Sequence, residues 1–237
     1  MSDTIFYVIM VPMVYFALAW CIAGITVKIV SLVKAPSFPH TLKIFPETKT
    51  PGLAAVLDAF TMPTVREHKP LLWVFLIVFH VCILLLLLAH LDLLPQINIL
   101  SAESANMIGS GAVGLLLTLS VLYFLFRRFR TPVRELSVPA DYLLLFLLFC
   151  LFISGDIISW GNSWSSDGFV ITKQDFGQYL DGLLKFSFAD PRDMLTGSHY
   201  SIVATHVLLA NLFLIVLPFS KIMHTFFAVP LNKLRRG

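Results

Sequence analysis

The sequence has few charged residues. Only 13% of its 237 residues are Asp, Glu, Lys or Arg, whereas 57% are hydrophobic. The mean hydropathy of +0.84 is too high for a soluble domain of this length. Internal repeats and low-complexity tracts are not evident. The sequence therefore predicts one integral-membrane domain over residues 1–237, and a net charge of +3 is no footprint of nucleic-acid binding.

Cysteine is also scarce, and the familiar metal motifs are missing. The three cysteines, Cys21, Cys82 and Cys150, all fall within apolar segments, which excludes disulfides between loops. The absence of a CxxCH motif excludes a covalently attached c-type haem. No clustered HxxxH or HxxHH box is present, so a non-haem di-iron membrane oxygenase is not expected.

Five apolar segments reach the roughly 20 residues that a membrane-spanning helix needs. The sequence predicts an all-α membrane protein whose five transmembrane helices cover about residues 5–33, 71–94, 107–126, 141–160 and 200–226. The start, "MSDTIFYVIM", lacks the basic region of a signal peptide, so we expect the first segment to remain as a helix.

The distribution of Lys and Arg predicts the orientation. The first and third connecting loops are rich in these residues, whereas residues 91–106, in the second loop, contain none. Because basic loops stay on the cytoplasmic side, we expect the N-terminus outside and the C-terminus in the cytoplasm. The chain is then a multi-pass protein of a prokaryotic cytoplasmic (inner) membrane, with Trp160 and Trp164 at the membrane boundary.

Four histidines lie in or at the ends of two predicted helices. His80 and His90 are in the second helix, and His206 and His224 are in the fifth. In a continuous helix the 18-residue spacing is five turns, which places His206 and His224 on one face; His80 and His90 lie about 15 Å apart. Since the helices run in opposite directions, we expect an outer pair, His90 with His206, and an inner pair, His80 with His224.

Two helices that each offer an imidazole at two depths suit two stacked haems, because each haem iron takes two axial nitrogens. An ionisable group in a membrane helix is costly and therefore indicates a function. The glycines of "IGSGAVG", Gly109, Gly111 and Gly114, would allow a helix or a macrocycle to approach closely. From the residues alone, a proton or ion pathway and unrelated interhelical polar contacts stay open. A non-redox transporter or scaffold is the alternative from another class.

The histidine spacings of 10 and 18, the loop "FRRFRTPVRELSVPADYLLL" and the ending "HVLLANLFLIVLPFSKIMHTFFAVP" resemble the cytochrome b (gamma) subunit of respiratory nitrate reductase. The resemblance covers the second to fifth helices. It implies a four-helix core with two haems b, held by His90 with His206 and by His80 with His224. It further implies electron transfer, in either direction, between menaquinone or ubiquinone on the outer side and a cytoplasmic partner. Whether the chain is itself an enzyme stays open.

Within this family, "LKIFPETKTPGLAAVLDAF" and "HKPLLWVFLIVFH" look more like the DsrM branch of the sulfite-reduction-associated complex in sulfur-metabolising prokaryotes. That likeness implies a cytoplasmic iron–sulfur partner similar to the catalytic subunit of heterodisulfide reductase. It also implies further membrane and periplasmic subunits. A cytochrome of nitrate reductase or of heterodisulfide reductase is the alternative branch.

The quinone site is harder to predict, because the lysine that nitrate reductase relatives carry in the second loop is absent here. Polar candidates near the outer pair are Asp156, Glu103, His199 and Tyr200. Asp156 is the first choice as acceptor of a quinol proton, with a water-facing or helix-capping aspartate as the alternative. His199 is equally compatible with a plain interfacial position.

Three arginines follow the third predicted helix. Arg127, Arg128 and Arg130 could pair with haem propionates or dock the partner, since a guanidinium matches carboxylate geometry. Their ordinary role would be to mark a cytoplasmic loop.

Overall fold

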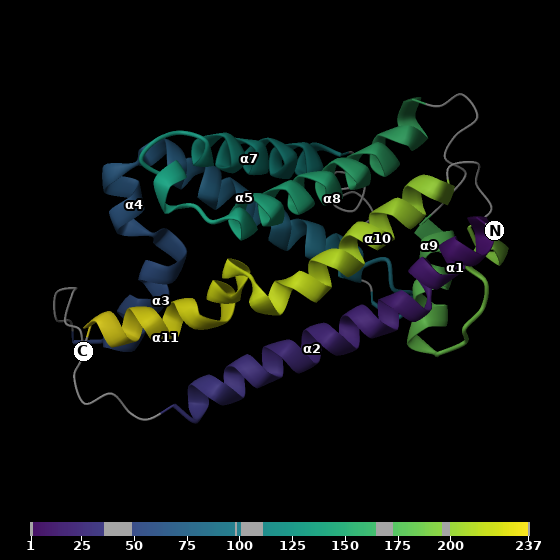
Figure 1. Ribbon diagram of the computed structural model, residues 1–237, viewed down its shortest axis with the longest axis horizontal. Helices are drawn as coiled ribbons and strands as arrows, with labels where there is room; N and C mark the ends of the chain where they lie inside the picture. The colour runs from purple at the N-terminus through teal and green to yellow at the C-terminus, as the bar shows by residue number, and fades with distance from the viewer. Residues whose placement is uncertain are drawn as a thin grey trace.

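The computed structural model describes residues 2–35, 49–97, 99–100, 111–164, 173–195 and 200–236, and the described ranges contain helices and no strand (Figure 1). The all-α prediction is confirmed. The α-helices are α1 Ser2–Met10, α2 Pro12–Val33, α3 Pro51–Thr61, α4 Pro63–His68, α5 Pro70–Leu91, α7 Ala112–Arg128, α8 Pro139–Trp164, α9 Lys173–Leu184, α10 Tyr200–Val216 and α11 His224–Arg236.

Four helical segments are long and apolar enough to cross a bilayer: Asp3–Val33, Pro70–Leu91, Pro139–Gly161 and Tyr200–Phe219. They correspond to four of the five predicted spans. The remaining one, 107–126, appears as α7, which has 17 described residues and begins at Ala112, while residues 107–110 lie outside the described ranges. Five spans and the orientation stay predictions.

The first span is broken near its N-terminal end. Pro12 begins α2 and has no backbone N–H to donate, so the helical hydrogen-bond pattern is interrupted at Val11. Side chains from distant elements satisfy two carbonyls next to the break. The Tyr179 hydroxyl donates to the Met10 carbonyl over 2.6 Å, and the Asn211 amide donates to that of Ile9 over 2.9 Å. The break therefore ties α1 to α9 and α10.

The predicted continuous helix over 200–226 is wrong. The helix α10 ends at Val216, and two short 3₁₀ turns, Leu217–Phe219 and Lys221–Met223, precede α11. Pro218 explains the break, because it lacks an N–H and its ring clashes with the preceding helical turn. Gly24 of α2 packs there so closely that an added Cβ would lie 2.7 Å from the Cβ of Pro218. His206 and His224 thus lie on different helices, not on one face of a single helix.

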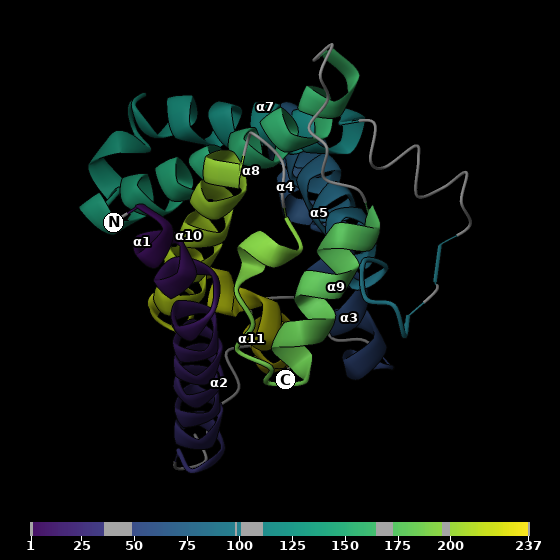
Figure 2. The same cartoon turned by 90° about the vertical axis from the view of Figure 1, so that its right-hand side faces the viewer.

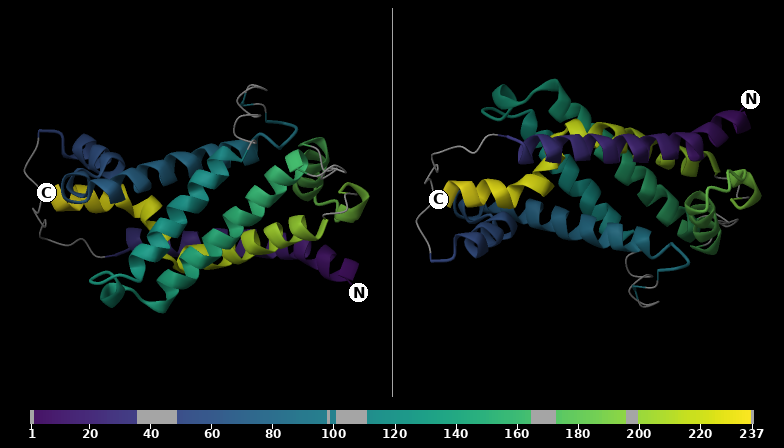
Figure 3. Two further views of the ribbon diagram at one scale, coloured as in Figure 1. Left: turned by 90° about the horizontal axis from the view of Figure 1, so that it is seen from above. Right: turned by 90° about the horizontal axis from the view of Figure 1, so that it is seen from below.

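The helices enclose two apolar cores. One lies between α5, α7 and α8 and includes Leu117, Val121 and Phe152. The other lies where α1, α9 and α10 meet and includes Met10 and Tyr200. In the end-on view of Figure 2, α2 stands at one edge and α7 at the opposite side, and Figure 3 shows α5, α7, α8 and α10 crossing obliquely. The chain termini lie at opposite ends of the long axis (Figure 1).

Candidate functional site

The outer pair is formed across α5 and α10. The rings of His90 and His206 have centroids 6.4 Å apart and planes 22° from parallel. His90 is the penultimate residue of α5, and its Nδ1 lies 2.7 Å from the Leu86 carbonyl one turn earlier. His206 Nδ1 lies 2.9 Å from the Ser154 hydroxyl of α8. Three helices therefore meet at this pair.

The inner pair is formed between the middle of α5 and the first residue of α11. The centroids of His80 and His224 are 6.1 Å apart, with the planes 83° from parallel. His80 Nδ1 lies 2.7 Å from the Leu76 carbonyl, and His224 Nδ1 lies 2.8 Å from the Lys221 carbonyl. The structure thus brings together the same partners that the resemblance implies. His224, however, lies on α11, beyond the break after Val216, and not on the helix of His206.

These Nδ1 contacts leave Nε2 as the available nitrogen of each ring. A carbonyl oxygen only accepts, so Nδ1 carries the proton in His80, His90 and His224. A neutral imidazole whose Nδ1–H is fixed by a hydrogen bond is the usual form of a metal ligand, because the bond sets both tautomer and ring orientation. These three rings therefore have the tautomer that axial ligation through Nε2 requires.

The ring separations also fit an iron between each pair. Two nitrogens at about 2 Å from one iron, with about 1 Å from each nitrogen to its ring centre, put the centroids about 6 Å apart. The observed 6.1 and 6.4 Å match that spacing. Among the described residues no group of three or more His, Cys, Asp or Glu side chains converges. A pair supplies two ligands only, which suits a macrocycle that brings four ligands of its own.

Asp156 is buried between α7 and α8, two residues beyond Ser154, which bonds to His206. Its side chain is 2% exposed, and Oδ2 accepts a hydrogen bond from the Thr118 hydroxyl over 2.8 Å. Gly114 faces it, since a Cβ added there would overlap the carboxylate. Gly155, the preceding residue, lies against the ring of His206. The alternative of a water-facing aspartate is therefore wrong, because the Asp156 carboxylate is buried between two helices.

The other quinone-site candidates are placed less favourably. Tyr200 lies six positions before His206 on α10, which turns it about 120° away from that ligand. It packs edge-on against Phe6 and beneath the guanidinium of Arg192, in the core with α1. Its hydroxyl has no hydrogen-bond partner in the described part of the chain. Glu103 and His199 lie outside the described residues.

Of the three arginines at the end of α7, one is already engaged. Arg128 donates to Asp141 over 3.0 Å and to the Ser137 hydroxyl over 3.1 Å. Arg127 is half-buried, and Arg130 is exposed just beyond the helix. Arg127 and Arg130 are therefore better placed than Arg128 to meet a propionate or a partner.

A cleft opens near the outer pair. It measures about 630 Å³ and is lined by the segment after α5, from Asp92 to Ile97, together with Gln174, Gly177 and Gln178 of α9. Asp92 itself is buried and accepts from the backbone N–H groups of Ile99 and Leu100. Among the described residues that line the cleft, Gln174 and Gln178 of α9 supply the further polar side chains.

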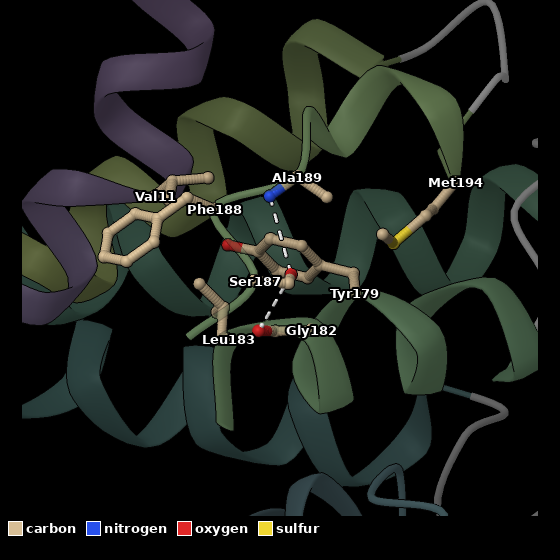
Figure 4. A pocket seen from close by; sticks show the side chains of 8 residues that line it. All are labelled: Val11, Tyr179, Gly182, Leu183, Ser187, Phe188, Ala189 and Met194. Atoms are coloured by element: carbon tan, nitrogen blue, oxygen red, sulfur yellow. Dashed lines mark hydrogen bonds between the residues drawn. The ribbon is translucent and has the colours of Figure 1, made fainter. Parts of the chain in front are cut away.

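A second hollow is too small for a ligand. It lies between α9, Val11 and the segment after Gly182 and holds about 10 Å³, the space of one water molecule (Figure 4). Figure 4 shows Tyr179 and Met194 across it, with the Ser187 hydroxyl bonded to the Gly182 carbonyl. It is a packing detail of the α9 region.

Two supporting groups escaped the sequence reasoning. Ser154 bonds to His206, and Asp141, 4% exposed, accepts from both Arg128 and Lys221. Lys221 in turn offers its carbonyl to His224. A serine followed by glycine within "LFISGDII" was the available signal for Ser154. No local pattern reveals Asp141, because its partners lie 13 and 80 residues away.

The chain was compared with known families and proteins. The model of the nitrate reductase gamma subunit family matches residues 64–237, well over half of the chain. A relative from Archaeoglobus fulgidus, described as an Hdr-like menaquinol oxidoreductase cytochrome b-like subunit, is 29% identical over 163 residues, which are 65% of this chain and 47% of the relative. The chain thus spans about half the length of that relative. No solved structure matches the chain significantly.

The matched region contains both histidine pairs and the helices that carry them. Membership of this family implies binding of haem b, to which the donor set described above is suited. The chain belongs to the nitrate reductase gamma subunit family and is a membrane electron-transfer cytochrome b.

Proposed function

We propose that the chain is a di-haem b subunit that transfers electrons between a quinone on the outer side of the membrane and a cytoplasmic iron–sulfur partner. The observation that carries the proposal is the occurrence of two histidine pairs with ring centroids 6.1 and 6.4 Å apart. His90 and His206 would hold the outer haem, and His80 and His224 the inner one. The haem irons, when bound, supply one-electron carriers at two depths of the membrane.

The protein's own contribution is to hold and orient the ligands. Nδ1–H donation fixes the tautomer of His80, His90 and His224 and turns Nε2 away from the backbone that accepts the bond. Along α5 the two ligands lie about 15 Å apart, a separation fixed by ten residues of regular helix. A rigid helix that supplies one ligand to each haem sets the distance between the two carriers.

On the outer side we place the quinone site close to His90 and His206. Two features support this location: the buried carboxylate of Asp156, and the cleft that begins two residues beyond His90. Asp156 would accept a proton when a quinol is oxidised, and the Thr118 hydroxyl holds the carboxylate in place. The amides of Gln174 and Gln178 suit the carbonyl and hydroxyl oxygens of a quinone head group.

The partner assignment draws on the relative and on the likeness to the DsrM branch. The name of the Archaeoglobus fulgidus protein combines an Hdr-like complex with menaquinol, which favours menaquinone and a heterodisulfide-reductase-like iron–sulfur subunit for this chain too. We place that subunit at the cytoplasmic end, near Arg127 and Arg130. Further membrane and periplasmic subunits of a sulfur-metabolism complex complete the proposed assembly, in the prokaryotic inner membrane.

The purified chain tests this proposal directly. We expect a dithionite-reduced b-type spectrum and a pyridine haemochrome close to two haems per chain. A non-redox scaffold or transporter predicts a colourless protein, and such a preparation from haem-replete cells would refute the proposal. Reoxidation of the reduced haems by a menaquinone analogue in liposomes then tests the exchange with quinone.

A further inference from the structure

One of the four histidines differs from the others in the partner of its Nδ1. His80, His90 and His224 each bond to a backbone carbonyl three or four residues earlier in their own segment. His206 instead bonds to the side chain of Ser154, which belongs to α8 and lies 52 residues away. The orientation of His206 therefore depends on a contact between helices, and on a group that a single substitution removes.

The hydrogen-bond chain at Ser154 assigns its protons. The Ser154 hydroxyl donates its only proton to the Leu151 carbonyl over 2.8 Å. It can then only accept from His206, whose Nδ1 must carry the proton, as in the other three rings. The side chain of Ser154 is 6% exposed, so water does not substitute for it readily.

The neighbouring glycine completes the seat for the ring. A Cβ added to Gly155 would lie 3.2 Å from Cε1 of His206, closer than ordinary contacts between such atoms. The backbone of α8 is thus pressed against the edge of the imidazole. Ser154 fixes the ring through a hydrogen bond, and Gly155 leaves the space that the ring occupies.

We infer that Ser154 is a positioning residue that orients His206 and sets the reduction potential of the outer haem. The inference rests on the proposed ligation of that haem. Nδ1–H donation raises the basicity of an axial imidazole and stabilises the ferric state. A hydroxyl, unlike the fixed carbonyls behind the other three ligands, can be deleted without altering the backbone. The Leu151 backbone also interacts with His206, but it stays in place when the hydroxyl is removed. Ser154 is therefore the side chain through which the outer haem can be tuned.

The test is a potentiometric titration of the purified protein, following both haems by their spectra, in Ser154→Ala, Ser154→Thr and the parent chain. We expect Ser154→Ala to shift the outer midpoint potential upward and to leave the inner one in place, because the ferric state loses its support. Ser154→Thr, which keeps the hydroxyl, should restore the parent value. Loss of the outer haem from Ser154→Ala that Ser154→Thr restores would equally support the inference.

Ser120→Ala is the matched control. Ser120 is 1% exposed and donates to the Leu116 carbonyl of its own helix, α7, so its removal deletes a buried hydroxyl of the same kind. It should move neither potential. Unchanged potentials in Ser154→Ala at full haem content, equal shifts of both haems, or a haem loss that Ser154→Thr does not restore would overturn the inference. A parent chain without haem would refute the proposed function itself and is a separate outcome.

Discussion

The imidazoles of His90 and His206 lie 6.4 Å apart, ring centre to ring centre, with their planes within 22° of parallel. They come from α5 and α10, two helices separated by more than a hundred residues of sequence. Each Nδ1 is engaged, one by the Leu86 carbonyl and the other by the Ser154 hydroxyl. Two near-parallel rings with their Nε2 atoms available form a site for a metal centre that needs two axial ligands.

The close approach of α7 and α8 depends on Gly114. We expect Gly114→Ala to destabilise the protein by about 1–3 kcal/mol, because the added methyl group overlaps the buried Asp156 carboxylate and forces the helices apart. Thermal unfolding in detergent, followed by circular dichroism, measures the effect. Gly52→Ala in α3 is the control, since a Cβ there meets nothing within 4 Å. Equal unfolding midpoints for the two variants would contradict the packing described here.

The position of His224 depends on Asp141. Asn at this position weakens the bonds from Arg128 and from Lys221, whose carbonyl holds His224. We expect Asp141→Asn to cost about 1–3 kcal/mol of stability, as for other buried charged hydrogen bonds, and to lower occupancy of the inner haem more than that of the outer one. Haem content and spectra of the purified variant measure this. Equal loss of both haems would argue against a specific link to His224.

Removal of the Asp156 charge should affect quinone chemistry and spare haem binding. We expect Asp156→Asn to slow the reduction of the haems by a quinol analogue by about 10²-fold, the range of a lost general base. Stopped-flow absorbance measures this rate. Glu67→Gln, which removes an exposed carboxylate of α4, is the control and should leave the rate unchanged. A normal rate in Asp156→Asn would remove Asp156 from the proton path.

The link between α9 and the segment after α5 should respond to acid. Hydrogen bonds from Lys185 and then Gln96 lower the pKa of Asp181 below its usual 3.8. A depressed folded-state pKa means that the stabilisation is complete above the unfolded value and is lost as the pH falls through the folded one. The protection of the α9 amides against hydrogen exchange, relative to their intrinsic rates at each pH, should therefore be constant near neutral pH and fall only below about pH 4. A fall in protection already at pH 6 would show that another group controls this contact.

The all-α fold and four of the spans could be predicted from the sequence, because runs of leucine, valine and phenylalanine dominate each span. The sequence predicted the end of α5 at residue 94, three residues beyond the observed end at Leu91. It failed at Pro12 and Pro218, where the apolar run continues although the helix cannot. Hydropathy measures partition into lipid, and a missing N–H within an apolar run does not change that average.

The histidine pairs were predictable for a different reason. An ionisable imidazole is costly to place in lipid. The four histidines His80, His90, His206 and His224 therefore stand out from the apolar residues around them. Ser154 and Asp141 do not stand out, because a serine within a helix and an aspartate in the first turn of one have many ordinary roles. Only the packing of α8 against α10, and of the Lys221 turn against α8, gives these two residues their partners.

The most direct test of the paired arrangement is the haem content of four single variants, His80→Ala, His90→Ala, His206→Ala and His224→Ala, measured by pyridine haemochrome and by redox titration. His90→Ala and His206→Ala should each lose the same outer haem and retain about one haem per chain, while His80→Ala and His224→Ala should each lose the inner one. His68→Ala is the control: His68 makes a similar Nδ1 bond, to the Thr64 carbonyl, but lies on α4, outside both pairs. Two haems retained in His206→Ala, or different haems lost from His90→Ala and His206→Ala, would contradict the account.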